Sequence, residues 1–186
     1  MALPVISEMF ASKPAPSVLG YARGYAGFAE QAGAEVRRVE PARAHSAIII
    51  AFGGRLTVGP IGDARGELPS FVAGAGSGPL ISSHDGRLQC VEIDFAPWAS
   101  TVLLGAPLAA QDGPVALADL LGRDATTLTG RLAAVSVWSE RFALLDDLFS
   151  ARIARARRLP RREVLWAWEQ LERTGGAIPI DALARE

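Results

Sequence analysis

Cysteine, histidine and lysine are all scarce in this chain of 186 residues. Its single cysteine, Cys90, excludes an intrachain disulfide and a cluster of thiolate metal ligands. The two histidines, His45 and His84, lie far apart, and the His-x-His pattern with a third ligand that a metal-binding barrel would need is absent. The sequence therefore predicts no metal site and no cofactor.

A strong charge bias and long apolar runs are also absent. The 19 Lys and Arg residues nearly balance the 20 Asp and Glu residues, so net charge indicates neither nucleic acid nor a membrane surface as a partner. No apolar run approaches the ~20 residues of a membrane helix, and the N-terminal segment lacks the basic start of a signal peptide. A hydrophobic content of 49% is typical of a globular chain with a substantial core. We expect a cytoplasmic protein.

Motifs for nucleophilic catalysis and phosphate binding are missing as well. The chain contains no Gly-x-Ser-x-Gly, no phosphate-binding loop and no dinucleotide fingerprint. Glu92 and Asp94 form a carboxylate pair, for which a solvated strand face is a simpler interpretation than acid–base chemistry. His84 is interpreted as a turn residue, and Cys90 as a strand thiol without activating neighbours. No catalytic residue is predicted, and we do not expect an enzyme.

The first half of the chain has the pattern of short strands separated by Gly-rich turns, which is typical of a barrel or sandwich. The expected strands cover residues 36–39, 46–52, 55–58, 70–73, 79–82 and 88–95. Gly53-Gly54 predicts a tight hairpin, and Asp85-Gly86 predicts a turn. In the last strand Val91, Ile93 and Phe95 alternate with Cys90, Glu92 and Asp94, so one face is buried and the other is wet or lines something polar.

From Pro97 onward the hydrophobic period becomes helical. Glycines and prolines divide this half into expected helices at residues 97–104, 115–121, 124–135, 161–173 and a longer one after Ser136. Asp124 and Ser136 are the expected N-caps of two of these helices. A β half followed by an α half predicts the α+β class.

The end of the sequence begins a new element. Gly175-Gly176 ends the last long helix, and Asp181 is an expected N-cap for residues 182–186, which are too few to hold a helix by themselves. We interpret this segment as the start of a further domain; a frayed terminal turn of a complete protein is the alternative.

Several short segments follow one another in a specific order. They are residues 16–25 (PSVLGYARGY), 48–53 (IIIAFG), 70–74 (SFVAG), 84–87 (HDGR), 91–97 (VEIDFAP), 103–107 (LLGAP), 117–122 (LADLLG), 138–146 (WSERFALLD) and 166–176. In this order they resemble the N-terminal part of bacterial AraC-family transcriptional regulators. The resemblance implies a cupin-like antiparallel β-barrel sensor in residues 1–96, a helical linker and dimerisation subdomain in residues 97–176, and the start of a truncated helix-turn-helix domain in residues 177–186.

By this resemblance the chain is a ligand-sensing or dimerisation domain, and DNA is contacted only through a C-terminal domain that this sequence lacks. We expect a small-molecule effector and a homodimer. From strand alternation, the expected pocket residues are Tyr25, His45, Ile48, Ile50, Phe52, Val91, Glu92, Ile93 and Phe95; a shift by one residue would reverse the strand face. Trp138 and Trp166 are the expected interface residues.

Two alternatives remain open. One is a stand-alone cupin-like small-molecule-binding protein or enzyme, which would be indicated by His45, His84 and Glu92 within hydrogen-bond reach in one pocket. The other is a dimerisation module that binds no ligand.

Overall fold

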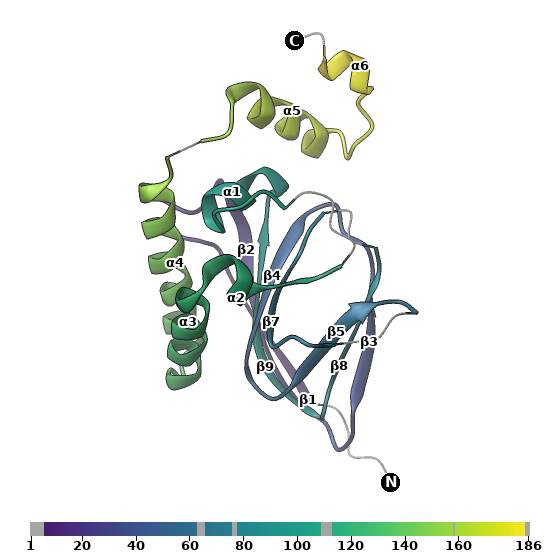
Figure 1. Cartoon of the computed structure of the whole chain (residues 1–186), viewed down its shortest axis with the longest axis vertical. Helices are drawn as coiled ribbons and strands as arrows, with labels where there is room; N and C mark the ends of the chain where they lie inside the picture. The colour runs from purple at the N-terminus through teal and green to yellow at the C-terminus, as the bar shows by residue number, and fades with distance from the viewer. Residues whose placement is uncertain (1–5, 63–65, 76–77, 109–112, 158, 185–186) are drawn as a thin grey trace.

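Two antiparallel sheets form the β part of the computed structural model, which describes residues 6–62, 66–75, 78–108, 113–157 and 159–184 (Figure 1). The six-stranded sheet contains, in spatial order, β1 (Ile6–Ser12), β2 (Ala22–Gln31), β9 (Arg87–Phe95), β4 (Ser46–Gly53), β7 (Ser70–Ala73) and β10 (Val115–Ala116). The four-stranded sheet contains β3 (Val36–Glu40), β8 (Leu80–His84), β5 (Leu56–Pro60) and β6 (Gly66–Glu67).

Helices follow the strands along the chain. They are η1 (Pro97–Ala99), α1 (Ser100–Leu103), α2 (Leu117–Leu121), α3 (Arg123–Ala134), α4 (Trp138–Arg155), α5 (Arg162–Arg173) and α6 (Ile180–Leu183). Helices α2, α3 and α4 lie on the six-stranded sheet, on the side away from the four-stranded sheet, and α5 and α6 lie at one end of the molecule beyond α1 (Figure 1). The α+β class is confirmed. The described strands form no closed barrel, so the expected cupin-like barrel is not confirmed.

Two short glycine turns carry the chain from one sheet to the other. The turn at Gly54 joins β4 to β5, and the turn at Gly86 joins β8 to β9. Both glycines have a positive φ, and a Cβ on Gly54 would lie 1.9 Å from the backbone oxygen of Arg87. The two crossings are therefore in contact, and only glycine fits there. The predicted turns are confirmed, but the hairpin is wrong because β4 and β5 pair with other strands.

The central strands of the six-stranded sheet, β9, β4 and β7, carry buried side chains on both faces. On one face, Val91, Ile93 and Phe95 of β9 are completely buried against a hydrophobic cluster that includes Leu145 and Phe149 of α4. On the other face, a smaller cluster between the two sheets holds Cys90, Leu88, Leu56, Val58 and Phe71. The alternation expected for β9 is thus confirmed. Its Cys90 side faces the second sheet, because the two crossovers fold that sheet over it.

Strands β1 and β2 were not expected from the sequence. β2, with the sequence ARGYAGFAEQ, contains no β-branched residue and has two glycines, so it lacks the usual composition of a strand. It nevertheless pairs along its length with β1 on one side and β9 on the other. Tertiary pairing outweighs local propensity at this position.

The expected helix caps are wrong, although the helices themselves form. Gly122 and Val137 occupy the N-cap positions of α3 and α4, so Asp124 lies inside α3 and Ser136 precedes the cap of α4. Asp181 lies in the first turn of α6, whose N-cap is Pro179. Asp124 and Asp181 still sit where a carboxylate interacts favourably with the helix dipole.

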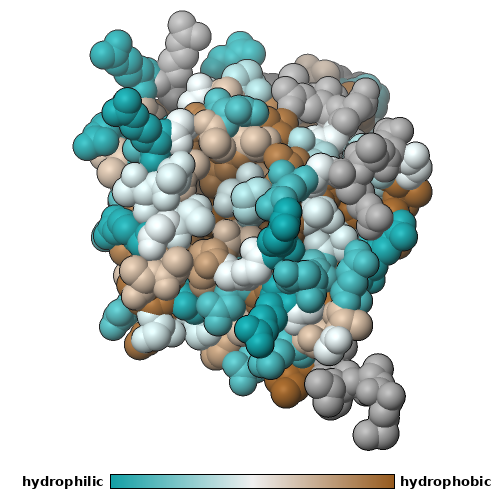
Figure 2. Space-filling model, turned by 60° about the horizontal axis from the view of Figure 1, so that its bottom comes forward, coloured by the Kyte–Doolittle hydropathy of each residue, from teal (hydrophilic) through white to brown (hydrophobic). Residues whose placement is uncertain are grey.

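The outer surface carries hydrophobic side chains in small groups. Figure 2 shows one end of the molecule, where hydrophobic residues lie between hydrophilic ones and form no large continuous area. Helix α5 has no fully buried residue; it is held by packing of Trp168 against the main cluster and by an ion pair of 2.7 Å between Arg23 and Glu172. None of the described helices is long and apolar enough to cross a membrane.

Candidate ligand-binding pocket

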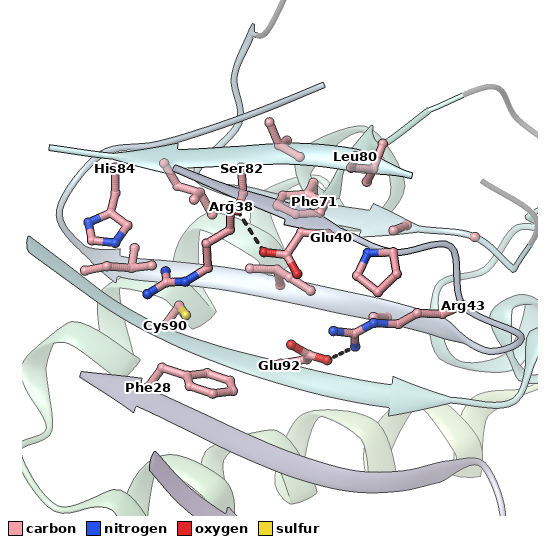
Figure 3. Close-up of a pocket in the computed structure, with 18 of the residues that line it drawn as sticks. Phe28, Arg38, Glu40, Arg43, Phe71, Leu80, Ser82, His84, Cys90 and Glu92 are labelled. Atoms are coloured by element: carbon pink, nitrogen blue, oxygen red, sulfur yellow. Dashed lines mark hydrogen bonds and ion pairs between the residues drawn. The ribbon is translucent and has the colours of Figure 1, made fainter. Parts of the chain in front are cut away.

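A cavity of about 310 Å³ lies between the two sheets (Figure 3). Its apolar lining comes from both sheets and comprises Phe28, Pro41, Ala47, Ile49, Leu56, Val58, Phe71, Ala73, Leu80, Leu88 and Cys90. Its polar lining comprises Glu30, Arg38, Glu40, Arg43, His45, Ser82, His84 and Glu92. The size and the mixture of apolar walls with a few polar groups are those of a small-molecule site.

Glu30, Arg38 and His84 form a polar group at one end of the cavity, which we call the inner triad. The Glu30 carboxylate lies 3.0 Å from His84 Nε2 and accepts a hydrogen bond of 2.8 Å from Arg38 Nη2. The His84 side chain is 2% exposed and the Glu30 side chain 7%. These contacts join β2 of one sheet to β3 and β8 of the other, so the triad links the two sheets.

Arg43, His45 and Glu92 line the opposite end of the cavity, with Asp94 beside them and the Glu40 carboxylate reaching back towards Ser82. We call these five residues the mouth cluster. Arg43 forms an ion pair with Glu92 and lies 3.6 Å from Asp94, which also lies 3.2 Å from His45 Nε2. Glu40 accepts a hydrogen bond of 2.9 Å from the Ser82 hydroxyl and forms no ion pair with any described residue. Figure 3 shows His84 and Arg38 towards one end of the pocket, Arg43 and Glu92 towards the other, and Glu40 between them beside Ser82.

Burial changes the acidity of two groups in the cavity. Desolvation raises the pKa of Glu92, and the neighbouring Asp94 and Glu40 raise it further, while Arg43 opposes them. Burial also raises the pKa of the Cys90 thiol to about 12, with smaller contributions from Glu92 and Glu30. Cys90 is therefore a protonated thiol at neutral pH and not an activated nucleophile.

Three polar side chains of the cavity are paired with other residues of the chain. His45, His84 and Glu92 do line one pocket, but their hydrogen bonds and ion pairs are made with Asp94, Glu30 and Arg43 respectively. Among the described residues, no group of three or more His, Cys, Asp or Glu side chains is placed to hold a metal ion. What the cavity offers is a set of fixed hydrogen-bonding groups between apolar walls.

The sequence-predicted pocket residues divide between the two faces of the sheet. His45 and Glu92 line the cavity. Six others lie in the helix-facing hydrophobic cluster and are absent from the cavity wall: Tyr25, Ile48, Ile50, Val91, Ile93 and Phe95. Phe52 is also turned towards the helices, where its ring lies 4.6 Å from the Arg141 guanidinium. On these strands the cavity is therefore lined by the residues next to the predicted ones, whose side chains point to the opposite face of the sheet.

The cavity-facing positions of the same strands were missed because of how their residues were interpreted. On β9 the alternation of Cys90, Glu92 and Asp94 predicts a face that is wet or lines something polar, and of these three only Glu92 is among the expected pocket residues. On β3, Arg38 and Glu40 alternate in the same manner. Charged residues at alternate positions of two strands were the available signal, since two such faces can enclose a polar pocket between them.

The two tryptophans expected at an interface have different surroundings. Trp138 is half-buried within its own chain, stacked on Phe10 at 4.7 Å between ring centroids and lying over the Arg141 guanidinium at 4.5 Å. Trp166 is half-buried on α5. Neither placement tests a contact with a second chain.

Comparison with known proteins finds little similarity. No known protein family matches the chain, and no curated protein matches it. Among solved structures it is similar to the crystal structure of the AraC-like transcriptional activator CuxR, with 14% sequence identity and a TM-score of 0.45, over 96% of this chain and 69% of that one. At these values the similarity does not establish a family, and the pocket has to carry the functional assignment.

Proposed function

We propose that this chain is the ligand-sensing domain of a bacterial transcriptional regulator of the AraC type. A small molecule binds between the two sheets, and the occupied state is passed to the helices on the other side of the six-stranded sheet. The order of the sequence segments that resemble that family supports the regulatory part of the proposal. The pocket supports the sensing part.

The observation that carries the proposal is the cavity itself. The two sheets do not pack fully against one another, and the space between them holds buried polar groups such as His84 and Glu30. Burying such groups is costly unless they are satisfied, and a bound molecule with matching groups recovers that cost. A purely structural sandwich would gain more from a filled apolar core.

Strand β4 offers a route from the pocket to the helices. Ala47 and Ile49 line the cavity, while Ile48 and Ile50, on the opposite face of the same strand, belong to the helix-facing cluster. A ligand that binds one position of β4 better than another shifts the population of helix arrangements by that difference in affinity.

The remaining elements of the proposal concern assembly. We propose a homodimer in which Trp166 on α5 contributes to the interface, with residues 97–176 as the linking and dimerising part. DNA recognition is assigned to a helix-turn-helix domain that follows this region. Sedimentation of the purified chain tests the dimer, and Trp166→Ala should lower its association constant if α5 lies in the contact.

A thermal-shift screen of a metabolite library tests ligand sensing. We expect at least one compound to raise the melting temperature of the wild-type chain. Ala73→Leu, which adds bulk to the cavity wall, should weaken that shift, whereas Ala34→Leu on the exposed surface should leave it unchanged. A flat screen, or a shift that survives Ala73→Leu unaltered, contradicts sensing at this pocket.

An enzyme or a stand-alone binding protein is the second candidate, and the paired Glu30 and His84 are the observation that favours an enzyme. A carboxylate that orients an imidazole is a common arrangement in acid–base catalysis. Incubating each screening hit with the protein and looking for a chemically changed product distinguishes turnover from binding.

A further inference from the structure

We propose that the pocket takes a small organic cation: an apolar body with an uncharged hydrogen-bond donor at one end, which meets His84, and an ammonium group at the other, which meets Glu40 and Glu92. This inference rests on the proposed sensing function and specifies the chemical class of the ligand.

The inner end is built to accept a hydrogen bond. The Glu30 carboxylate can only accept, and it already accepts from Arg38, so His84 Nε2 must carry the proton that faces it. In the neutral imidazole, Nδ1 is then the acceptor. Nδ1 is buried and has no hydrogen-bond partner among the described residues, and the His84 side chain lines the cavity. A ligand hydroxyl or N–H satisfies it.

Charge at the inner end favours an uncharged group. Arg38 and Glu30 form an ion pair of 2.8 Å, so their opposite charges offset one another. A ligand carboxylate placed here would meet the Glu30 carboxylate and an Nδ1 lone pair, both unfavourable to it. A hydroxyl donates to Nδ1 without bringing a charge into a buried space.

The middle of the cavity is apolar. Phe28, Ile49, Val58 and Phe71 line it, and the Cys90 thiol, uncharged at neutral pH, completes the wall. A ring or a short hydrocarbon body fits such walls.

The mouth cluster has more negative than positive charge. Three carboxylates, Glu40, Glu92 and Asp94, are accompanied by one guanidinium, that of Arg43, and by His45. Each of the carboxylates is within electrostatic reach of Arg43, but Glu40 is not ion-paired with any described residue. A second cation at this end relieves the repulsion between the carboxylates. An anionic head group would add to it.

The spacing of the two ends limits the length of the ligand. His84 and Leu80 lie at opposite ends of β8, and Leu80 pairs with Glu40 of β3. Four residues of strand correspond to roughly 13 Å between backbone positions. The Glu40 carboxylate reaches back to the Ser82 hydroxyl, two residues from His84 along β8, so the two groups that meet the ligand are closer together than these backbone positions. A single aromatic ring with a two-carbon amine is of suitable length.

Four matched compounds test each end separately by calorimetry at pH 8, where an ordinary imidazole is neutral. Tyramine carries both the phenol and the ammonium group; phenethylamine lacks the hydroxyl, 4-ethylphenol lacks the ammonium, and 4-hydroxyphenylacetate replaces the cation with an anion. We expect tyramine to bind with a Kd below about 1 mM. Removing either end group should weaken binding about tenfold or more, and the anion should bind most weakly.

Variants locate the cation. Glu40→Gln should weaken tyramine binding several-fold and leave 4-ethylphenol binding unchanged, because only the former carries the charge. Glu35→Gln, a matched change on the exposed surface, should affect neither. Both variants should show wild-type circular dichroism.

The result that overturns the proposal is binding of 4-hydroxyphenylacetate as tight as that of tyramine, or no binding of tyramine at all. If uncharged or anionic compounds from the library bind and Ala73→Leu prevents their binding, the proposed sensing function is supported and the proposal of a cationic ligand is wrong. If no compound in the library raises the melting temperature either, both proposals are wrong.

Discussion

The two faces of the six-stranded sheet differ in what packs against them. The helix-facing side is a continuous apolar core in which Ile48, Ile93 and Phe95 have no exposed surface. The pocket-facing side carries Glu92, Cys90 and Ile49 around a cavity. Both sides are made by the same strands. One face is thus committed to stability, while the other retains space and polar groups that a close-packed core would exclude.

The reactivity of Cys90 tests how far water is excluded from the pocket-facing side. Its pKa of about 12, against an ordinary value of 9.0, lowers the thiolate fraction on the order of 10³-fold. We expect iodoacetamide to alkylate the native protein about 1,000-fold more slowly than the urea-denatured chain at the same pH. Mass spectrometry measures both rates. Equal rates would mean that water reaches the Cys90 thiol in the native protein and that the pocket-facing side is not desolvated.

Neighbouring isoleucines compare the two faces directly. Ile48→Ala removes a fully buried side chain from the core and should cost about 2–5 kcal/mol of unfolding free energy. Ile49→Ala enlarges an existing cavity and should cost less, about 1–2 kcal/mol. Urea unfolding of both variants measures the difference. Equal costs would show that the pocket is packed as tightly as the core.

Two glycines of β2 test the packing on the helix side. A Cβ on Gly27 would lie 2.2 Å from the Trp138 ring, so Gly27→Ala should displace that ring and cost about 1–3 kcal/mol. Gly24→Ala meets nothing within 4 Å and should change stability by less than about 0.5 kcal/mol. Thermal unfolding distinguishes them. A neutral Gly27→Ala would mean that Trp138 moves freely and that α4 is loosely attached.

The pH dependence contributed by Glu92 is the smallest expected effect. Because burial raises its pKa in the folded state above the ordinary 4.5, the folded chain holds this proton to higher pH than the unfolded chain does. Its contribution to stability is therefore fully present below about pH 4.5 and is lost as the pH rises through the raised value.

Glu92→Gln removes this dependence. The stability of the wild type relative to Glu92→Gln should fall as pH rises from about 4 towards neutrality, and denaturant unfolding across that range measures it. Glu35→Gln on the exposed surface is the control. An increase with pH would show that the ion pair with Arg43 outweighs burial.

Much of the secondary structure could be predicted from local pattern. The strands around Ile49, Val58 and Val72 and the helical stripe of Phe142, Leu145 and Phe149 appear where periodicity places them. β2 could not be predicted, since its Ala- and Gly-rich sequence forms a strand only when β1 and β9 flank it. The caps of α3 and α4 were misplaced because these helices begin after Gly122 and Val137, neither of which makes a side-chain capping hydrogen bond.

The candidate site was predictable only in part. Alternation along β4 and β9 identified two faces, but nothing in a period of two says which face meets helices and which meets another sheet. His45 and Glu92 were placed in the pocket by their polarity, and His84 was assigned to a turn. Its pairing with Glu30 spans 54 positions and two sheets, and no local pattern encodes it.

The sequence by itself determined the α+β class and the alternation of the strands, because composition and period are local properties. Tertiary structure decided that Gly54 and Gly86 carry the chain between sheets instead of closing hairpins. That crossing decides which face of the sheet encloses the cavity. The physical reason is that a face acquires its role from what packs against it, and the packing partners come from distant parts of the chain.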